Sequence, residues 1–358
     1  MSIMRGFSNS AFLTAALLAG LVCPASANAV APNDAAAEDG LEVRRFLMDP
    51  VKSWGYQLQR LDVAALAASP FDLLVIDHAP DRVDSVEMLF RRSQIDQIKV
   101  KPDGSRRVVL AYMSIGEAEH YRFYWDDKWM EKGSCPVWMG PVNPQWAGNY
   151  PVQYWEPQWQ SLIFGQSDSY VDRVLDAGFD GIYLDRADVY DQFKSRPAAR
   201  SDMVSFVAKM IDHARLIKPE AIVVLQNAEE LLRDKALRAR LDGAAKESLY
   251  FNADKAGEPI PLEEQQASAS DLQLMKRAGG KVMVVEYLDS AKQAGVARRR
   301  AKQDGFLVHF TERNLATLNL NGPDAPPVLA SLSASSASRE PRTATSSDPQ
   351  IARTGPCR

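Results

Sequence analysis

The most constraining feature of this sequence is an alternation of short apolar runs with helical stretches over residues 46–320. Eight apolar runs bounded by turn residues are typical of β-strands. Several of the stretches between them, such as residues 201–220 and 290–305, resemble amphipathic helices. Eight strand–helix units predict an α/β fold, a (β/α)₈ TIM barrel. The competing doubly wound sheet has no supporting G-x-G-x-x-G loop. The eight runs are residues 53–59, 71–77, 107–117, 178–185, 221–229, 241–251, 281–289 and 305–310.

The two ends of the chain differ in character from this body. Arg5, an apolar run over residues 11–22 and small residues up to Ala29 predict a signal peptide over residues 1–29. We therefore expect a secreted or periplasmic protein. A linker is predicted over 30–45, the barrel over 46–320, and a disordered Ser/Ala/Pro-rich tail over 321–358. No other segment is apolar for long enough to cross a membrane, so stable membrane insertion is not expected.

The composition and the absence of several known motifs narrow the classes of function that are open to this chain. The formal net charge is −4, with 42 Lys and Arg against 46 Asp and Glu, which does not favour nucleic acid as a partner. The four histidines form neither an H-x-H pair nor an H-E-x-x-H motif, so no metal site is expected. The sequence also lacks a G-x-S-x-G elbow and a Walker-type phosphate loop. We expect a monomer without a cofactor.

Polar residues stand at or near the ends of several predicted strands. In a parallel barrel these carboxyl ends meet at one mouth, which is where such barrels place their active sites. Each residue alone is compatible with a simple strand cap, but repetition on several strands favours a shared site. Two carboxyl groups flanking a bond are the standard equipment of glycoside hydrolysis. The residues are Asp77, Ser114, Glu117, Asp185, Asn227, Glu247 and Glu286.

Six of the seven tryptophans fall between residues 125 and 159, in the segment that joins the third and fourth predicted strands. Indole and phenol faces pack well against sugar rings. The alternative is that a long loop needs an aromatic core of its own, and we expect this to account for about half of them. Tyr150, Tyr154 and Trp155 are predicted to be surface platforms for substrate.

Several motifs together resemble glycoside hydrolase family 114, the endo-α-1,4-polygalactosaminidases. The similarity covers about residues 50–310 and rests on "SWGYQLQ", "LLVIDHAP", "VLAYMSIGEAEHYRFYW", "NPQWAGNYPVQYWEPQWQ", "AGFDGIYLDRADVY" and "AAKESLYF". The resemblance implies a (β/α)₈ barrel that cleaves α-1,4-linked galactosamine polymers internally. It implies Asp185 as the nucleophile and Glu247 as the acid/base, with retention of configuration. The chain departs from the family pattern at Arg186 and Gln226.

A polymer with free amines is cationic, and a mouth lined with carboxylates would attract it. Glu117 is expected to bind substrate, the alternative being a salt bridge to Arg122. Asp188 either binds an amine or hydroxyl or caps the following helix. Glu286 lies among apolar strand residues, which favours a role in the barrel interior because an unused buried charge is costly. Together with Asp77 and Asn227, it is predicted to bind substrate. Tyr56, Tyr112 and Ser114 are predicted to donate hydrogen bonds to sugar hydroxyls.

Two other functions remain open from the sequence. One is a non-catalytic carbohydrate-binding barrel, which the presence of both Asp185 and Glu247 disfavours. The other is a barrel hydrolase or deacetylase that acts on a different amino-sugar polymer.

Overall fold

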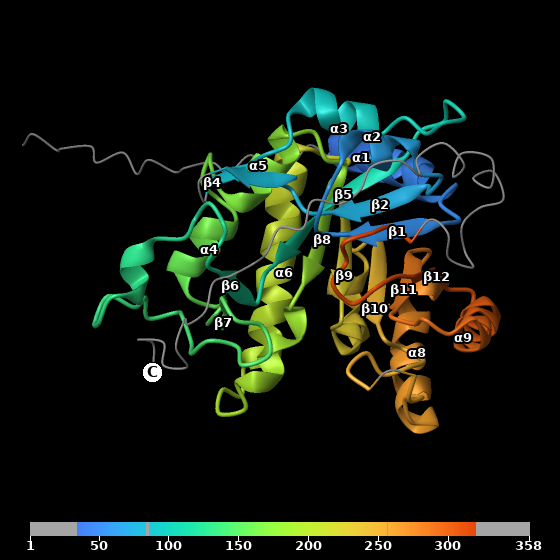
Figure 1. The fold of residues 1–358 in the computed structure, drawn as a ribbon. Coiled ribbons are helices and arrows are strands. Elements are labelled where there is room, and N and C mark those ends of the chain that lie inside the picture. The colour runs from blue at the N-terminus through green and yellow to red at the C-terminus, as the bar shows by residue number, and fades with distance from the viewer. Residues whose placement is uncertain (1–33, 84–85, 256, 320–358) are drawn as a thin grey trace, which may run out of the picture.

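The computed structural model describes residues 34–83, 86–255 and 257–319, and it contains an eight-stranded parallel sheet wound into a nearly closed barrel (Figure 1). Every strand lies within one of the eight apolar runs, so the predicted (β/α)₈ barrel is confirmed. The strands, in hydrogen-bonded order, are β1 (Trp54–Gln57), β2 (Leu73–Ile76), β5 (Val108–Ser114), β8 (Gly181–Asp185), β9 (Ile222–Gln226), β10 (Gly243–Glu247), β11 (Lys281–Glu286) and β12 (Leu307–Phe310).

The strands are apolar on both faces because both faces are covered. Leu73 and Val75 of β2 point into the barrel, whereas Leu74 and Ile76 pack against the surrounding helices. This alternation follows from the two-residue period of a strand, and burial on both faces produces the continuous apolar runs seen in the sequence. The inward side carries a layer of aromatic rings, including Trp54 of β1.

The barrel is joined at its seam by the segment that follows the last strand. β1 and β12 stand at the two ends of the hydrogen-bonded order and lie next to each other. Just beyond β1, the backbone N–H groups of Leu58 and Gln59 donate to the carbonyl of Leu315, at 2.9 and 3.2 Å. The side chain of Gln57 donates to the carbonyl of Ala316.

Helices surround the strands, with α2 and α3 near the top of the view, α4 and α5 on the left and α8 and α9 on the right (Figure 1). α5 ends two residues before Gly178, whose φ of +98° suits glycine and turns the chain toward β8. The helices are α1 (Asp34–Met48), α2 (Val63–Ala68), α3 (Arg92–Ile98), α4 (Pro157–Ile163), α5 (Tyr170–Asp176), α6 (Ala199–Ile217), α7 (Lys235–Arg238), α8 (Leu262–Arg277) and α9 (Ala291–Asp304), with short 3₁₀ turns η1 (Asp127–Met130), η2 (Ala187–Gln192) and η3 (Glu229–Arg233).

Two small antiparallel pairs of strands extend the barrel beyond its eight strands. β3 (Asp81–Val83) pairs with β4 (Val86–Met88) after β2. β6 (Glu117–Glu119) pairs with β7 (Asn149–Pro151) in the long connection between β5 and β8. We call residues 115–169 of this connection the aromatic insertion, since they contain six of the seven tryptophans.

The N-terminal helix corrects one sequence prediction. A linker was expected over residues 30–45, but α1 is helical from Asp34 and packs on the barrel. Its buried Arg44 donates to the carbonyl of Pro219 at 2.6 Å and to Asp242 at 3.0 Å. The predicted signal peptide (1–29) and tail (321–358) lie outside the described residues. None of the described helices has the length and apolar character needed to span a membrane.

Candidate active site

Three neighbouring strands deliver the central residues of the site. Asp185 is the last residue of β8, Asn227 follows β9 directly, and Glu247 is the last residue of β10. β8, β9 and β10 are consecutive in the barrel. Their carboxyl ends therefore bring side chains that are 62 positions apart in the sequence to one place at the barrel mouth.

The amide of Asn227 bridges the two carboxylates. Its Nδ2 atom lies 2.6 Å from Oε2 of Glu247 and 3.5 Å from Oδ1 of Asp185. These two oxygens are therefore no more than about 6.1 Å apart. The Asn227 Oδ1 atom also accepts the backbone N–H of Glu247 at 3.0 Å, which fixes the orientation of the amide. Asp185 and Glu247 face each other across one shared donor.

Asp185 is held in a buried, hydrogen-bonded position. It is 7% exposed, and the hydroxyl of Tyr112 donates to its Oδ2 atom at 2.9 Å. Burial, and to a smaller extent the charge of Glu247, raise the pKa of Asp185 to about 7, against the opposing effect of Arg186.

Glu247 is more open to solvent and accepts hydrogen bonds from three side chains. Gln226 donates to it at 3.1 Å, Asn227 donates as described, and the hydroxyl of Tyr287 donates to Oε1. Donors of this kind orient a carboxylate. Neither Gln226 nor Tyr287 was predicted from the sequence to belong to the site.

The alternation along β11 explains why Tyr287 was missed. Met283 and Val285 point into the barrel, so Tyr287 continues on the inward side and Glu286 points outward. Glu286 is 0% exposed and accepts the backbone N–H groups of Tyr250 and Phe251, at 2.8 and 3.2 Å. The prediction that Glu286 binds substrate is therefore wrong, because its carboxyl holds the loop after β10. The alternation of side chains along the strand, counted from the inward-facing Val285, predicts that Tyr287 faces the site.

The same alternation of side chains places Lys246 on the side of β10 that faces away from the site. Lys246 precedes Glu247 on β10, and it contacts Glu229 at 2.9 Å on the outer side of the strand. This agrees with the expectation that neighbours on a regular strand face opposite sides.

Each of the three site strands is followed by a residue in the left-handed region. Arg186, Asn227 and Ser248 have φ angles of 59°, 59° and 53°. Non-glycine residues rarely adopt this conformation, and such strain gathers at functional sites. The turns after β8, β9 and β10 therefore all begin with a non-glycine residue in the left-handed conformation.

Four of the predicted substrate-binding residues are too buried for a ligand to reach. Ser114 is 0% exposed and donates to the carbonyl of Glu117 at 3.2 Å. Tyr154 is 0% exposed and donates to the carbonyl of Ala199 at 2.6 Å. Tyr56 is 1% exposed and lies below the acids, where burial raises its pKa and the charges of Asp185 and Glu247 add to this. The fourth is Glu117.

Glu117 holds the aromatic insertion against the turn after β8. It is 1% exposed and accepts from Asn143 at 2.8 Å and from Arg186 at 2.9 Å. The alternative of an ion pair with Arg122 is also wrong, because Arg122 pairs with Glu119, at 2.6 Å. Both expectations missed Arg186 as the partner.

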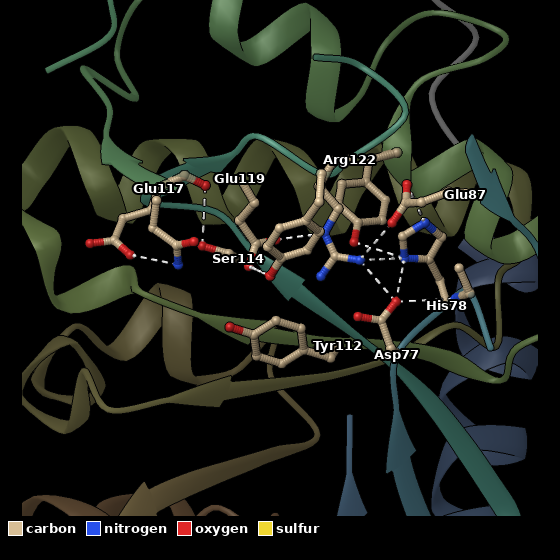
Figure 2. A network of polar contacts seen from close by, with 12 residues as sticks. Asp77, His78, Glu87, Tyr112, Ser114, Glu117, Glu119 and Arg122 are labelled. Atoms are coloured by element: carbon tan, nitrogen blue, oxygen red, sulfur yellow. Dashed lines mark hydrogen bonds and ion pairs between the residues drawn. The ribbon is translucent and has the colours of Figure 1, made fainter. Parts of the chain in front are cut away.

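Asp77 belongs to a buried charge network (Figure 2). Nη1 of Arg122 lies 2.8 Å from Oδ1 of Asp77, 3.1 Å from Nδ1 of His78 and 3.1 Å from Oε1 of Glu87. Burial favours the neutral acid, but the charge of Arg122 and the hydrogen bond with His78 hold the pKa of Asp77 well below its usual range. Asp77 is 9% exposed, and its carboxylate forms an ion pair with Arg122. This disfavours the predicted contact with substrate.

Asp77, His78 and Glu87 also have the spacing of metal ligands, with one ligand atom from each lying within 4.8 Å of the others. The guanidinium of Arg122 contacts all three of these residues. A cation already neutralises them, so the arrangement fits an ion-pair network better than a metal centre.

The tyrosine platforms expected in the aromatic insertion are buried. Tyr150 is 3% exposed, and Tyr154 has no exposed surface. Trp155 is half-buried against Phe193, with the guanidinium of Arg196 4.2 Å from its ring centre. These residues form part of an aromatic core of the insertion, which was the alternative to surface platforms for substrate. Among all the tryptophans, only Trp146 is classed as exposed, at 49%.

Asp188 lies in η2 beside the site and lines a pocket of about 430 Å³. Its Oδ2 atom is 3.3 Å from Nη1 of Arg186, and it lies in the first turn of η2, after the N-cap residue Arg186. Burial raises the pKa of Asp188. Arg186, Asn143 and Gln145 line the same pocket, so it opens between the aromatic insertion and the turn after β8.

A parallel barrel with two carboxyl groups converging at its mouth defines a protein of the glycoside hydrolase type. The chain belongs to glycoside hydrolase family GH114, whose family model matches residues 36–325. This confirms the family resemblance inferred from the sequence motifs.

The chain is also similar to uncharacterized sequence relatives and shares its fold with solved structures. An uncharacterized protein of Deinococcus radiodurans is 34% identical over 77% of this chain and 85% of its own length. An uncharacterized protein of Thermotoga maritima is 33% identical over 76% and 84%. The glycoside hydrolase domain of PelA from Pseudomonas aeruginosa has a TM-score of 0.57 at 18% identity, over 75% of this chain and 97% of that domain. Aspergillus fumigatus Ega3 in complex with galactosamine has a TM-score of 0.55 at 20% identity, over 74% and 92%.

Proposed function

We propose that this protein is an endo-acting hydrolase of polysaccharides that contain α-1,4-linked galactosamine, with Asp185 as nucleophile and Glu247 as acid/base. The observation that carries the proposal is the Asn227 amide that touches both carboxylates at the mouth of a GH114 barrel. The Ega3 structure, which has the same fold, was solved with galactosamine.

The proposed reaction has two steps. Asp185 attacks the anomeric carbon while Glu247 gives its proton to the leaving glycosidic oxygen. Glu247 then takes a proton from water, which attacks the same carbon and releases Asp185. Retaining enzymes hold their carboxyl groups about 5–5.5 Å apart and inverting enzymes about 6.5–9.5 Å apart. Retention is proposed from the family resemblance, since the limit of about 6.1 Å holds for one pair of oxygens and lies between these two ranges.

The electrostatics of the site suit a cationic sugar. A nucleophile must be ionised, and the pKa of Asp185 is raised to about 7, first by burial and then by Glu247. The ammonium group of a bound galactosamine unit would favour the ionised form of Asp185. Tyr112 and Asn227, which donate to the carboxylate, act in the same direction.

The test is incubation of purified protein with deacetylated and acetylated galactosaminoglycan, followed by mass spectrometry of the fragments. We expect internal cleavage of the deacetylated polymer and its loss in Asp185→Asn and Glu247→Gln variants. Retained polysaccharide binding in Glu247→Gln would support the assignment of Glu247 to chemistry. If neither of these polymers nor any other amino-sugar polymer is cut, the proposed substrate is wrong.

We also infer that the protein acts outside the cytoplasm. Support comes from the order of charge, apolar run and small residues over positions 1–29. Mass spectrometry of protein recovered from the cell exterior or periplasm should give a new N-terminus after Ala27 or Ala29. An intact N-terminus on protein confined to the cytoplasm would overturn this inference.

A further inference from the structure

The exposed tryptophan of the aromatic insertion lies close to the site. Trp146 is 49% exposed, whereas Trp138 and Trp159 of the same insertion are 2% and 0% exposed. Leaving an indole in water forgoes the stabilisation that its burial would give. Trp146 is therefore an available flat apolar face in a segment whose other tryptophans are buried or half-buried.

A series of contacts connects Trp146 with Glu247. The guanidinium of Arg313 lies 5.6 Å from the ring centre of Trp146 and 5.2 Å from that of Tyr287. The hydroxyl of Tyr287 in turn donates to Glu247. Arg313 thus lies between an exposed ring and a ring that touches the site.

These residues come from opposite parts of the barrel. Trp146 belongs to the insertion after β5, the third strand in the barrel order, whereas Tyr287 follows β11, the seventh. The aromatic insertion therefore reaches across the mouth toward Arg313. Residues 143–145, just before Trp146, line the pocket that also contains Asp188. One continuous stretch borders both the Asp185 and the Glu247 sides of the site.

We propose that Trp146 and Arg313 form a sugar-binding subsite on the Glu247 side, which takes a unit of the polymer outside the reaction centre. This inference rests on the proposed function. The indole offers a flat face to the sugar ring, and Arg313 donates to hydroxyl groups. Asp254, 3.3 Å from Arg313 and with its side chain 74% exposed, is available to accept an ammonium group.

The subsite deepens the proposed function in one respect. A unit held at Trp146 and another in the pocket beside Asp188 would lie on the two sides of the catalytic pair. A chain that occupies both extends past the cleavage point in both directions. This arrangement fits internal cleavage and disfavours removal of single terminal units.

Binding, measured separately from catalysis, tests the subsite. In a Glu247→Gln background, affinity electrophoresis in gels containing deacetylated galactosaminoglycan measures the apparent Kd. We expect Trp146→Ala to weaken binding about tenfold and Trp146→Phe, which keeps a flat ring, to retain most of the affinity. Val137→Ala is the control, since Val137 is 72% exposed in the same insertion and should bind as the background does.

The outcomes separate this inference from the proposed function. Trp146-dependent binding supports the subsite even if native protein cuts no polymer, a result that would overturn only the hydrolase assignment. Cleavage of the polymer together with unchanged binding in Trp146→Ala overturns the subsite alone. Weakened binding of the same size in Val137→Ala would also overturn it, as would equal losses in Trp146→Phe and Trp146→Ala. Absence of any binding in the background variant overturns the subsite as well.

Discussion

The side-chain amide of Asn227 donates hydrogen bonds to both carboxyl groups of the site. It acts through the carboxylates, so we regard it as a positioning residue. We expect Asn227→Ala to lower kcat/KM about 100-fold, because small displacements of catalytic groups have effects of this size. The acid limb of the pH profile should also move to higher pH, since the carboxylates lose a donor that favours the ionised form.

The control for Asn227 is Gln158→Ala, which changes an exposed amide on α4. Its kcat/KM and pH profile should match those of the native protein. A variant Asn227→Ala with native kcat/KM, or with a lower kcat/KM but an unmoved acid limb, would contradict the positioning role.

The raised pKa of Asp185 makes a prediction about pH. Asp185 is protonated below a pKa of about 7 and cannot then act as a nucleophile. Measured kcat/KM should therefore rise with pH through about 7. Tyr112→Phe removes a hydrogen bond that stabilises the ionised carboxylate, so its acid limb should lie at higher pH. Activity that instead falls as the pH rises through this range would assign the acid role to Asp185.

At the scale of elements, the strand ends of β8, β9 and β10 store backbone strain. Ser248 has a φ of 53°, and its buried hydroxyl has no hydrogen-bond partner among the described residues. Glycine adopts this conformation at little cost. We expect Ser248→Gly to raise the free energy of unfolding by about 1 kcal/mol, as measured by urea denaturation.

Ser161→Gly is a matched control for Ser248→Gly. Ser161 is a half-buried residue within α4, where glycine should lower the free energy of unfolding by about 0.5–1 kcal/mol. The two substitutions remove the same side chain and should have opposite signs. Destabilisation by both would show that the left-handed turn after β10 carries no strain.

The elements themselves were predictable because each strand is buried on both faces and bounded by turn residues. The converging ends of β8, β9 and β10 follow from strand order, so Asp185, Asn227 and Glu247 could be placed together from sequence alone. The orientation of Glu286 was also open to prediction, but its charge was given more weight than the alternation along β11. Strand parity decides which side chain enters a barrel.

Contacts made by long side chains between distant loops were not predictable. Arg122 meets Asp77 and Glu87 across separations of 45 and 35 residues, and several carboxylates in the sequence were equally plausible partners. The exposure of Trp146 could not be predicted from the sequence for a similar reason. Six tryptophans in one insertion share the same composition signal, and only the folded loop decides which of them remain inside.

At the scale of the whole molecule, the Arg122 network attaches the aromatic insertion to the barrel. Arg122 lies in the insertion, Asp77 follows β2, and Glu87 belongs to the β3–β4 pair. All three side chains are largely buried, with side-chain exposures of 1%, 12% and 1%. One guanidinium of the insertion therefore pairs with carboxylates from two other parts of the fold.

Removing that guanidinium should destabilise the molecule strongly. Arg122→Met keeps much of the side-chain volume but leaves buried carboxylates without their cation. We expect the free energy of unfolding at neutral pH to fall by about 3–5 kcal/mol, as measured by urea denaturation. Arg240→Met is the control, because Arg240 and its partner Asp212 are 42% and 60% exposed and such a pair contributes about 0–1 kcal/mol.

The pH dependence of this loss gives a second check. Despite burial, Arg122 and His78 hold the pKa of Asp77 below its unfolded value. The stability that Asp77 contributes is therefore present above its unfolded pKa and is lost as the pH falls toward its folded pKa. In Arg122→Met this dependence should weaken, so the difference between native and variant should shrink in acid. A difference that stays constant down to low pH, or a loss no larger than that of Arg240→Met, would mean that packing around Arg122 attaches the insertion and its charge does not.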